Sequence, residues 1–156
     1  MKRGTTLKRG SQKPFTKSRK LTSDLLDQAY QFHGHKGAFI ALGLRIGLLA
    51  LKELDADGFF DMRCVVKLPY RPPYSCIVDG IQISTGCTMG KRNIKVEEGE
   101  GIEALFEKSE KKRKISLRHD VLNIIHENLK KGEEMGTDVF RKFFVESEES
   151  ELFLIG

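Results

Sequence analysis

Two groups of side chains in this sequence have the chemistry of a metal site. The segment HGHKGAF carries His33 and His35 on either side of Gly34. Two histidines at this spacing lie on nearly opposite sides of a regular helix, so they can hold one ion only if Gly34 kinks the backbone between them. Cys76 and Cys87 are the candidate thiolate ligands. Imidazole and thiolate together suit Zn²⁺, with nickel or iron as alternatives.

The same cysteines allow a second chemistry. Cys76 follows a Pro-Pro-Tyr turn, and Cys87 stands in the glycine-rich segment STGCTMG. If these two thiols cycle between dithiol and disulfide, the protein is a thiol redox protein without a metal. Cys64 lies on the apolar side of an alternating segment, where a buried thiol is ordinary. Histidines and cysteines this far apart also occur by chance, so their spacing alone leaves a purely structural role open.

Other polar residues give weaker indications. Asp79 can turn the chain, cap a following segment or accept a hydrogen bond from a metal-binding histidine. The segment GCTMGK differs from a phosphate-binding P-loop, because three residues instead of four separate its glycines and Arg92 follows Lys91. These two cations can meet an anionic ligand or form an exposed surface pair. No HExxH motif or Ser-His-Asp order indicates a hydrolase, and His119 and His126 receive no role.

The composition indicates one intracellular domain. A chain of 156 residues can bury a core without disulfides, and its three cysteines form no short-spaced pair. No secretory signal is visible, and the apolar stretch at residues 37–51, which Arg45 interrupts, is shorter than the ~20 residues that span a bilayer. We therefore expect a cytoplasmic protein without membrane contact.

The first twenty residues have a different character from the rest. They contain eight Lys or Arg and no acid, and the formal net charge of +5 becomes −3 when these eight are left out. Such a segment cannot bury enough apolar surface to order itself. The sequence predicts a disordered basic arm at residues 1–20 and a folded domain at residues 21–156. The arm is either a solvated tail or the one part of the chain that binds nucleic acid or another acidic partner.

The spacing of apolar residues predicts the elements that position these side chains. Helices are expected from Ser23 to the histidines, from there to about Leu54, at residues 120–131, and in a short segment capped by Thr137. Strands are expected at residues 59–68, 102–106 and 114–117 and in the C-terminal ELFLI, with a short buried segment before the glycine-rich loop. Gly43 and Gly47 should let a neighbouring backbone approach the second helix. The mixed order predicts a single α+β domain, with the N-terminal helices packed on a mixed or antiparallel sheet.

Two longer segments resemble the signature regions of the FmdE family, which is named after a component of formylmethanofuran dehydrogenase. The segment FHGHKGAFIALGLRIG resembles a first region in which HGH precedes a glycine-containing helix that ends in GxR. The segment CIVDGIQISTGCTMGKRN resembles a second region, CxxDGIQxxTGCTxGKxN, at nearly every position. The resemblance covers residues 21 to 118, and its motifs are specific.

The resemblance implies an α+β domain, a homodimer and a transition-metal site. By position, it makes His33, His35, Cys76 and Cys87 the metal ligands or their immediate neighbours. It also assigns four residues to the surroundings of the metal or to ligand binding, namely Asp79, Thr85, Lys91 and Asn93.

Two departures from the family pattern limit what the resemblance implies. Many members have Cys-Pro-Gly where this chain has Gly37, Ala38 and Phe39, so chemistry that depends on that cysteine is absent. No cysteine follows Cys87, so the chain resembles a shorter branch that lacks the C-terminal zinc ribbon.

The family takes its name from an enzyme of methanogenesis that transfers a formyl unit with a molybdenum or tungsten cofactor. By analogy we expect an accessory to that dehydrogenase or to metalloenzyme maturation, with a metalloenzyme as partner. An open position on a bound metal would permit Lewis-acid catalysis, and four protein ligands would favour a structural or carrier role. The sequence therefore leaves open whether the protein is an enzyme.

Overall fold

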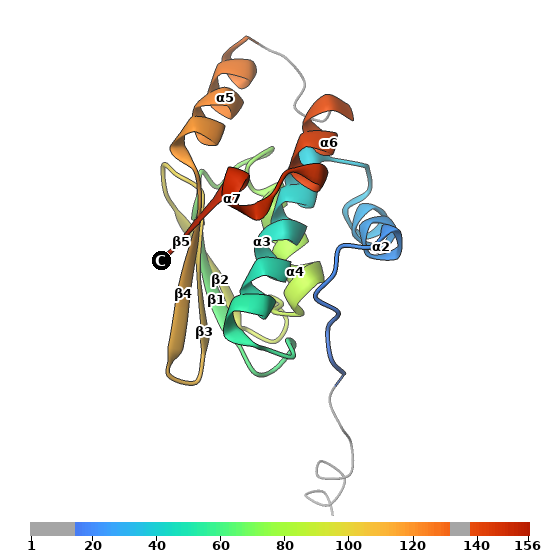
Figure 1. The fold of residues 1–156 in the computed structure, drawn as a ribbon, viewed down its shortest axis with the longest axis vertical. Coiled ribbons are helices and arrows are strands. Elements are labelled where there is room, and N and C mark those ends of the chain that lie inside the picture. The colour runs from blue at the N-terminus through green and yellow to red at the C-terminus, as the bar shows by residue number, and fades with distance from the viewer. Residues whose placement is uncertain (1–14, 132–137) are drawn as a thin grey trace, which may run out of the picture.

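The computed structural model describes residues 15–131 and 138–156, which form a single α+β domain (Figure 1). Its helices are α2 Ser23–His33, α3 Ala38–Leu54, α4 Cys76–Thr85, α5 His119–Lys130, α6 Asp138–Glu146 and α7 Glu149–Leu152. Its strands are β1 Arg63–Leu68, β2 Ile94–Glu98, β3 Glu103–Lys108, β4 Lys111–Leu117 and β5 Phe153–Ile155. The predicted fold class is confirmed. The predicted cap Thr137 lies outside the described residues.

The five strands form one mixed sheet in the order β2-β1-β3-β4-β5. Strands β1 and β2 are parallel and joined through α4, whereas the other pairs are antiparallel. The predicted alternation places Cys64, Val66 and Leu68 in the core. Phe60, inside the strand expected at residues 59–68, is 74% exposed because the strand begins only at Arg63. Strand β2 was not predicted.

Helix α2 ends where the sequence predicted a break. It begins at Ser23 as predicted, and its N-cap is Thr22, whose hydroxyl oxygen accepts a hydrogen bond from the Leu25 amide at 3.1 Å. Gly34 ends the helix with φ of +102°, a left-handed conformation that glycine adopts without steric cost. The chain therefore turns sharply between the two histidines.

Helices α3 and α4 pack in direct backbone contact. A Cβ atom on Gly43 would lie 2.1 Å from the Ile77 carbonyl oxygen, and one on Gly80 would lie 2.2 Å from the Ile40 carbonyl oxygen. The prediction that Gly43 and Gly47 permit close approach is confirmed. The partner is α4, which the sequence indicated only as a short buried segment.

Arg45 has a structural role inside the otherwise apolar helix α3. Its guanidinium donates hydrogen bonds of 2.8 to 2.9 Å to the carbonyl oxygens of Phe144, Val145 and Ser147. These carbonyls lie at the C-terminal end of α6, where the last turn of a helix leaves acceptors without partners. Arg45 thereby ties α6 to α3.

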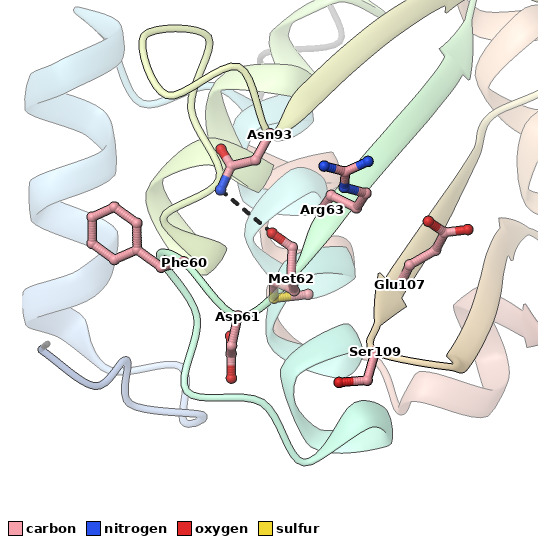
Figure 2. A pocket seen from close by; sticks show the side chains of 7 residues that line it. All are labelled: Phe60, Asp61, Met62, Arg63, Asn93, Glu107 and Ser109. Atoms are coloured by element: carbon pink, nitrogen blue, oxygen red, sulfur yellow. Dashed lines mark hydrogen bonds between the residues drawn. The ribbon is translucent and has the colours of Figure 1, made fainter.

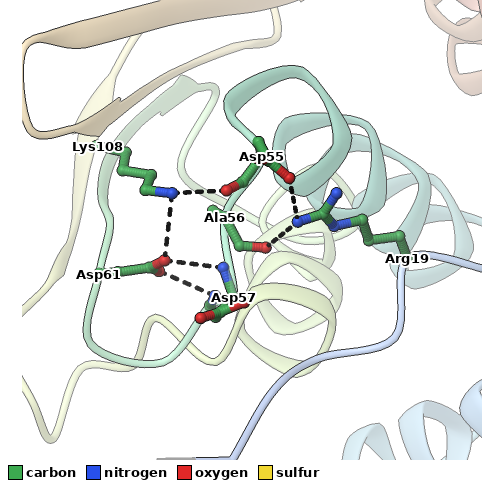
Figure 3. Close-up of polar contacts among 7 residues, drawn as sticks. Arg19, Asp55, Ala56, Asp57, Asp61 and Lys108 are labelled. Carbon is green, nitrogen blue, oxygen red and sulfur yellow. Dashed lines mark hydrogen bonds and ion pairs between the residues drawn. The ribbon is translucent and has the colours of Figure 1, made fainter.

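The chain before α2 contacts the loop after α3 (Figure 3). The Lys17 amide donates to the Asp57 carbonyl at 2.8 Å, and Arg19 pairs with Asp55 at 2.9 Å and donates to the Ala56 carbonyl at 3.0 Å. Residues 15–20, predicted as part of the disordered arm, thus contact the domain. The arm's residues 1–14 lie outside the described residues. In the part of the chain that the structure describes, no helix has the length and apolarity to cross a membrane.

Candidate metal centre

His33 and Asp79 meet where the end of α2 packs beside the first turns of α4. The His33 Nδ1 atom lies 2.7 Å from Asp79 Oδ2. Because an ionised carboxylate only accepts hydrogen bonds, Nδ1 carries the proton and donates it. In the neutral ring the lone pair is then on Nε2, which leaves that nitrogen free to bind a metal.

The other ring nitrogen of His33 has nothing to bind in the described structure. Nε2 is buried and has no hydrogen-bond partner among the described residues, and the His33 side chain is only 10% exposed. A buried polar atom without a partner costs about 1–3 kcal/mol. Such an orphaned nitrogen, aligned by a carboxylate at the opposite ring atom, has the arrangement found in metal-binding histidines.

His35 lies against His33 across the glycine turn. The two ring centroids are 4.6 Å apart, with an angle of 41° between the ring planes. A Cβ atom on Gly37 would come within 2.9 Å of His35 Cε1, so this glycine leaves room for the ring. The structure thus brings the two histidines together through the kink that their spacing required.

Cys76 is the first residue of α4, the helix that carries Asp79. It precedes Asp79 by three residues, a spacing that puts Cβ atoms about 5–6 Å apart on one helix face. Burial and the nearby Asp79 carboxylate raise the pKa of the half-buried Cys76 thiol, which is therefore protonated at neutral pH. Cys76 therefore shares the N-terminal end of α4 with Asp79, the partner of His33.

Cys87 lies at the opposite end of α4, beyond its C-cap Gly86. The helix has 10 residues, so at about 1.5 Å per residue roughly 15 Å separates its two ends. A disulfide requires Cα atoms within about 7 Å, so the predicted Cys76–Cys87 redox pair is wrong for this fold. The structure also does not bring Cys87 to the histidines. Within residues 15–131 and 138–156, no three His, Cys, Asp or Glu side chains are grouped to hold a metal ion.

Cys87 instead pairs with Cys64 in the core. Cys64 is 3% exposed and Cys87 is fully buried, and the Cys87 thiol donates to the Met62 carbonyl oxygen at 3.6 Å. A hydrogen bond from Cys64 lowers the pKa of Cys87 and raises the pKa of Cys64 well above its usual value. The prediction of a buried Cys64 is confirmed, but the contact between these two thiols was missed. The only sequence feature that indicated this contact was the position of Cys64 on the apolar side of its alternating segment.

The remaining predicted site residues fix the loop after α4. Thr85 Oγ1 accepts a hydrogen bond from the Cys87 amide at 3.0 Å. The Lys91 ammonium donates to the Gly86 carbonyl oxygen, and Asn93 Nδ2 donates to the Phe59 carbonyl oxygen at 2.7 Å. These side chains lie at the Cys87 end of α4, away from the paired histidines. Their predicted role in ligand binding stays a prediction.

A polar pocket opens beside this loop (Figure 2). Asp61, Arg63 and Glu107 line it together with Asn93, which donates to the Met62 carbonyl oxygen at 3.4 Å. The Asp61 carboxylate already accepts hydrogen bonds from the backbone amides of residues 57 and 58. The pocket shares no residue with the paired histidines, so it forms no part of the candidate metal centre.

The fold and this centre define a single-domain α+β protein with two histidines, one of them held by a carboxylate, at the N-terminal end of a buried helix. The family model described as "FmdE, Molybdenum formylmethanofuran dehydrogenase operon" matches residues 32–153. The chain belongs to the FmdE family, as its two signature segments predicted.

Two known proteins extend this comparison. A "Probable S-adenosyl-L-methionine-binding protein" of Archaeoglobus fulgidus is 36% identical over 81 residues, which make up 48% of this chain and 20% of that protein. This chain therefore corresponds to about one fifth of that relative's length. The solved structure of a tungsten formylmethanofuran dehydrogenase FmdE-like protein from Syntrophus aciditrophicus is similar, with a TM-score of 0.63 and 14% identity. The match covers 92% of this chain and 76% of that one, and at this identity it shows the fold alone.

Proposed function

We propose that this FmdE protein binds a transition metal, with His33 as the first ligand and His35 and Cys76 as further ligands. The observation that carries the proposal is the buried Nε2 of His33, which has no described partner while Asp79 holds Nδ1. A metal ion at Nε2 would satisfy this nitrogen. Two imidazoles and one thiolate favour zinc, with nickel or iron as alternatives.

Asp79 positions His33 in this proposal. A carboxylate that accepts the Nδ1 proton fixes the tautomer and the ring orientation, and it makes Nε2 a stronger ligand. His35 and Cys76 are proposed as further ligands because the exposed His35 ring lies against His33 and Cys76 shares a helix face with Asp79. Cys87 is left out of the proposed ligand set because α4 holds it at the other end of the helix.

The role of the metal follows from the number of ligands. Three protein ligands leave one position of a tetrahedral ion open, and a metal with an open position can act as a Lewis acid. We propose a role as an accessory to a molybdenum or tungsten formylmethanofuran dehydrogenase, supported by the description of the family and the name of the structural relative. Maturation of such a metalloenzyme is the alternative. The homodimer that the resemblance implied stays a prediction, which analytical ultracentrifugation can test.

The test is the metal content of the purified full chain after reconstitution with zinc under anaerobic, reducing conditions. Elemental mass spectrometry should find about one zinc per chain in the parent and a large loss in His33→Ala and Cys76→Ser. Cobalt substitution adds a visible spectrum that reports nitrogen and sulfur ligands. Cys87→Ser and Cys64→Ala each remove a thiol from the other end of α4, and they should keep the metal.

Two results would overturn this proposal. If the parent binds no zinc, cobalt or nickel above the level of a nonbinding control protein, the chain is no metal protein. If Cys64→Ala loses as much metal as Cys76→Ser while circular dichroism shows both variants folded, the metal lies at the buried thiols instead.

A further inference from the structure

A second pocket lies between the turn that precedes α4 and the helix α5. The turn contributes Arg71, Pro73 and Tyr74, and α5 contributes Leu129 and other side chains of one face. The cavity has a volume of about 490 Å³, which is in the range that small-molecule sites occupy. It shares no residue with the candidate metal centre or with the pocket of Figure 2.

The wall of this pocket is apolar and rigid. The Tyr74 side chain is 5% exposed, and its ring packs edge-on against Phe39 of α3 with centroids 5.9 Å apart. Tyr74 is thereby fixed to the central helix of the domain. Pro73 and Leu129 add apolar surface beside it. Because Tyr74 is buried, the apolar surface open to a ligand comes mainly from the prolines and Leu129.

The rim of the pocket is cationic. The Arg71 guanidinium lies over the Tyr74 ring, 5.4 Å from its centroid, and the His126 ring meets Tyr74 edge-on at 5.9 Å. Lys130 stands one helical turn after His126 on α5. Neither Arg71 nor Lys130 forms a salt bridge with any carboxylate in residues 15–131 and 138–156. Two cations without a described salt bridge in the lining of one pocket favour a negatively charged ligand.

We propose that this pocket binds a small organic anion, a molecule with a flat apolar part and a carboxylate or phosphate group. The apolar part would lie against Pro73 and Leu129, beside the buried Tyr74 ring. The anionic group would lie between the Arg71 guanidinium, whose planar fork matches carboxylate and phosphate oxygens, and the Lys130 ammonium. His126 can donate a further hydrogen bond from its ring.

The test is an NMR titration of the full chain at fixed ionic strength, which follows the Leu129 methyl groups and the His126 ring protons. Phenyl phosphate and benzoate are the probes, and inorganic phosphate and benzyl alcohol test the anionic and apolar parts alone. We expect saturable shifts at both residues with phenyl phosphate or benzoate, and at least tenfold weaker binding of the two partial probes.

Variants identify the groups that bind the anion. Arg71→Gln and Lys130→Gln should each weaken binding of phenyl phosphate at least fivefold. Lys111→Gln removes the same charge from an exposed position on β4 without a described salt bridge, and it should leave the affinity unchanged. Loss of affinity to the same extent in all three variants would indicate nonspecific attraction and overturn the proposal. The absence of saturable shifts with either aromatic anion at millimolar concentration would also overturn it.

Discussion

The two ends of α4 differ in whether the buried polar atoms around them have hydrogen-bond partners. At the N-terminal end, Asp79 orients His33, and the buried Nε2 of that ring has no partner among the described residues. At the C-terminal end, Cys87 contacts Cys64 and the Met62 carbonyl. The signature segment at residues 76–93 therefore contributes to a potential binding position through Asp79 and to a closed structural cluster through Cys87. A single motif can thus contain residues with different roles. The hydrogen-bond partners of each polar atom distinguish a possible ligand from a structural residue.

The largest expected effect is on stability, and it concerns the backbone contact between α3 and α4 that fixes both ends of α4. Gly80→Val would force a side chain against the Ile40 carbonyl, where even a Cβ atom would lie at 2.2 Å. We expect a loss of about 3 kcal/mol or more in the free energy of unfolding, measured by urea denaturation. Gly90→Ala is the control, because a Cβ atom there meets nothing within 4 Å and should change stability by less than about 0.5 kcal/mol. Equal stability of the two variants would contradict the close packing of α3 and α4.

The next prediction concerns the end of α4 that carries the candidate metal centre. Asp79→Asn replaces the carboxylate that holds His33 Nδ1, and loss of such a partner typically costs about 10–100-fold in metal affinity. Competition titrations with a zinc chelator measure this loss. Asp24→Asn makes the same charge change at an exposed position of α2 and should leave the zinc affinity unchanged. An unchanged affinity in Asp79→Asn would show that the His33–Asp79 pair is structural.

The opposite end of α4 should respond in stability and not in metal affinity. Asn93→Ala would leave the Thr88 amide and the Phe59 carbonyl without their present partners. We expect a loss of about 1–3 kcal/mol in the free energy of unfolding, together with an unchanged zinc affinity. Asn123→Ala, at an exposed position of α5, should stay within about 0.5 kcal/mol of the parent. A fall in zinc affinity in Asn93→Ala would show that the two ends of α4 act together in metal binding, and it would contradict this prediction.

The smallest expected effect compares the exposure of the thiols. At mildly alkaline pH, which offsets the raised pKa of its thiol, the half-buried Cys76 should react with iodoacetamide in the native chain, whereas burial should protect Cys64 and Cys87 until the domain unfolds. Mass spectrometry after brief labelling identifies the modified residue. Saturating zinc should then slow the labelling of Cys76, which connects this measurement with the proposed ligand set. Early modification of Cys87 would mean that its end of α4 opens readily.

The sequence predicted the elements whose apolar pattern is long and regular. The run of apolar residues in α3 is longer than a typical buried strand, so it predicts a helix. The alternation of Cys64, Val66 and Leu68 predicts a half-buried strand. Helix α4 was missed because its ten residues include β-branched side chains and Gly80, which local propensity does not assign to a helix. Strand β2 was missed because its outward residues are charged and its pairing with β1 depends on the crossover through α4.

The sequence by itself determined the residue types of the centre, the family, and the glycine kink that lets His33 and His35 meet. It could not determine which cysteine shares an end of its element with Asp79, because spacing along the chain does not reveal the direction or length of the element between two residues. Only the tertiary structure decided that α4 is a helix packed on α3, with Cys76 and Asp79 at one end and Cys87 at the other. The physical reason is that a rigid helix of 10 residues keeps its ends apart, whatever chemistry the side chains could otherwise share.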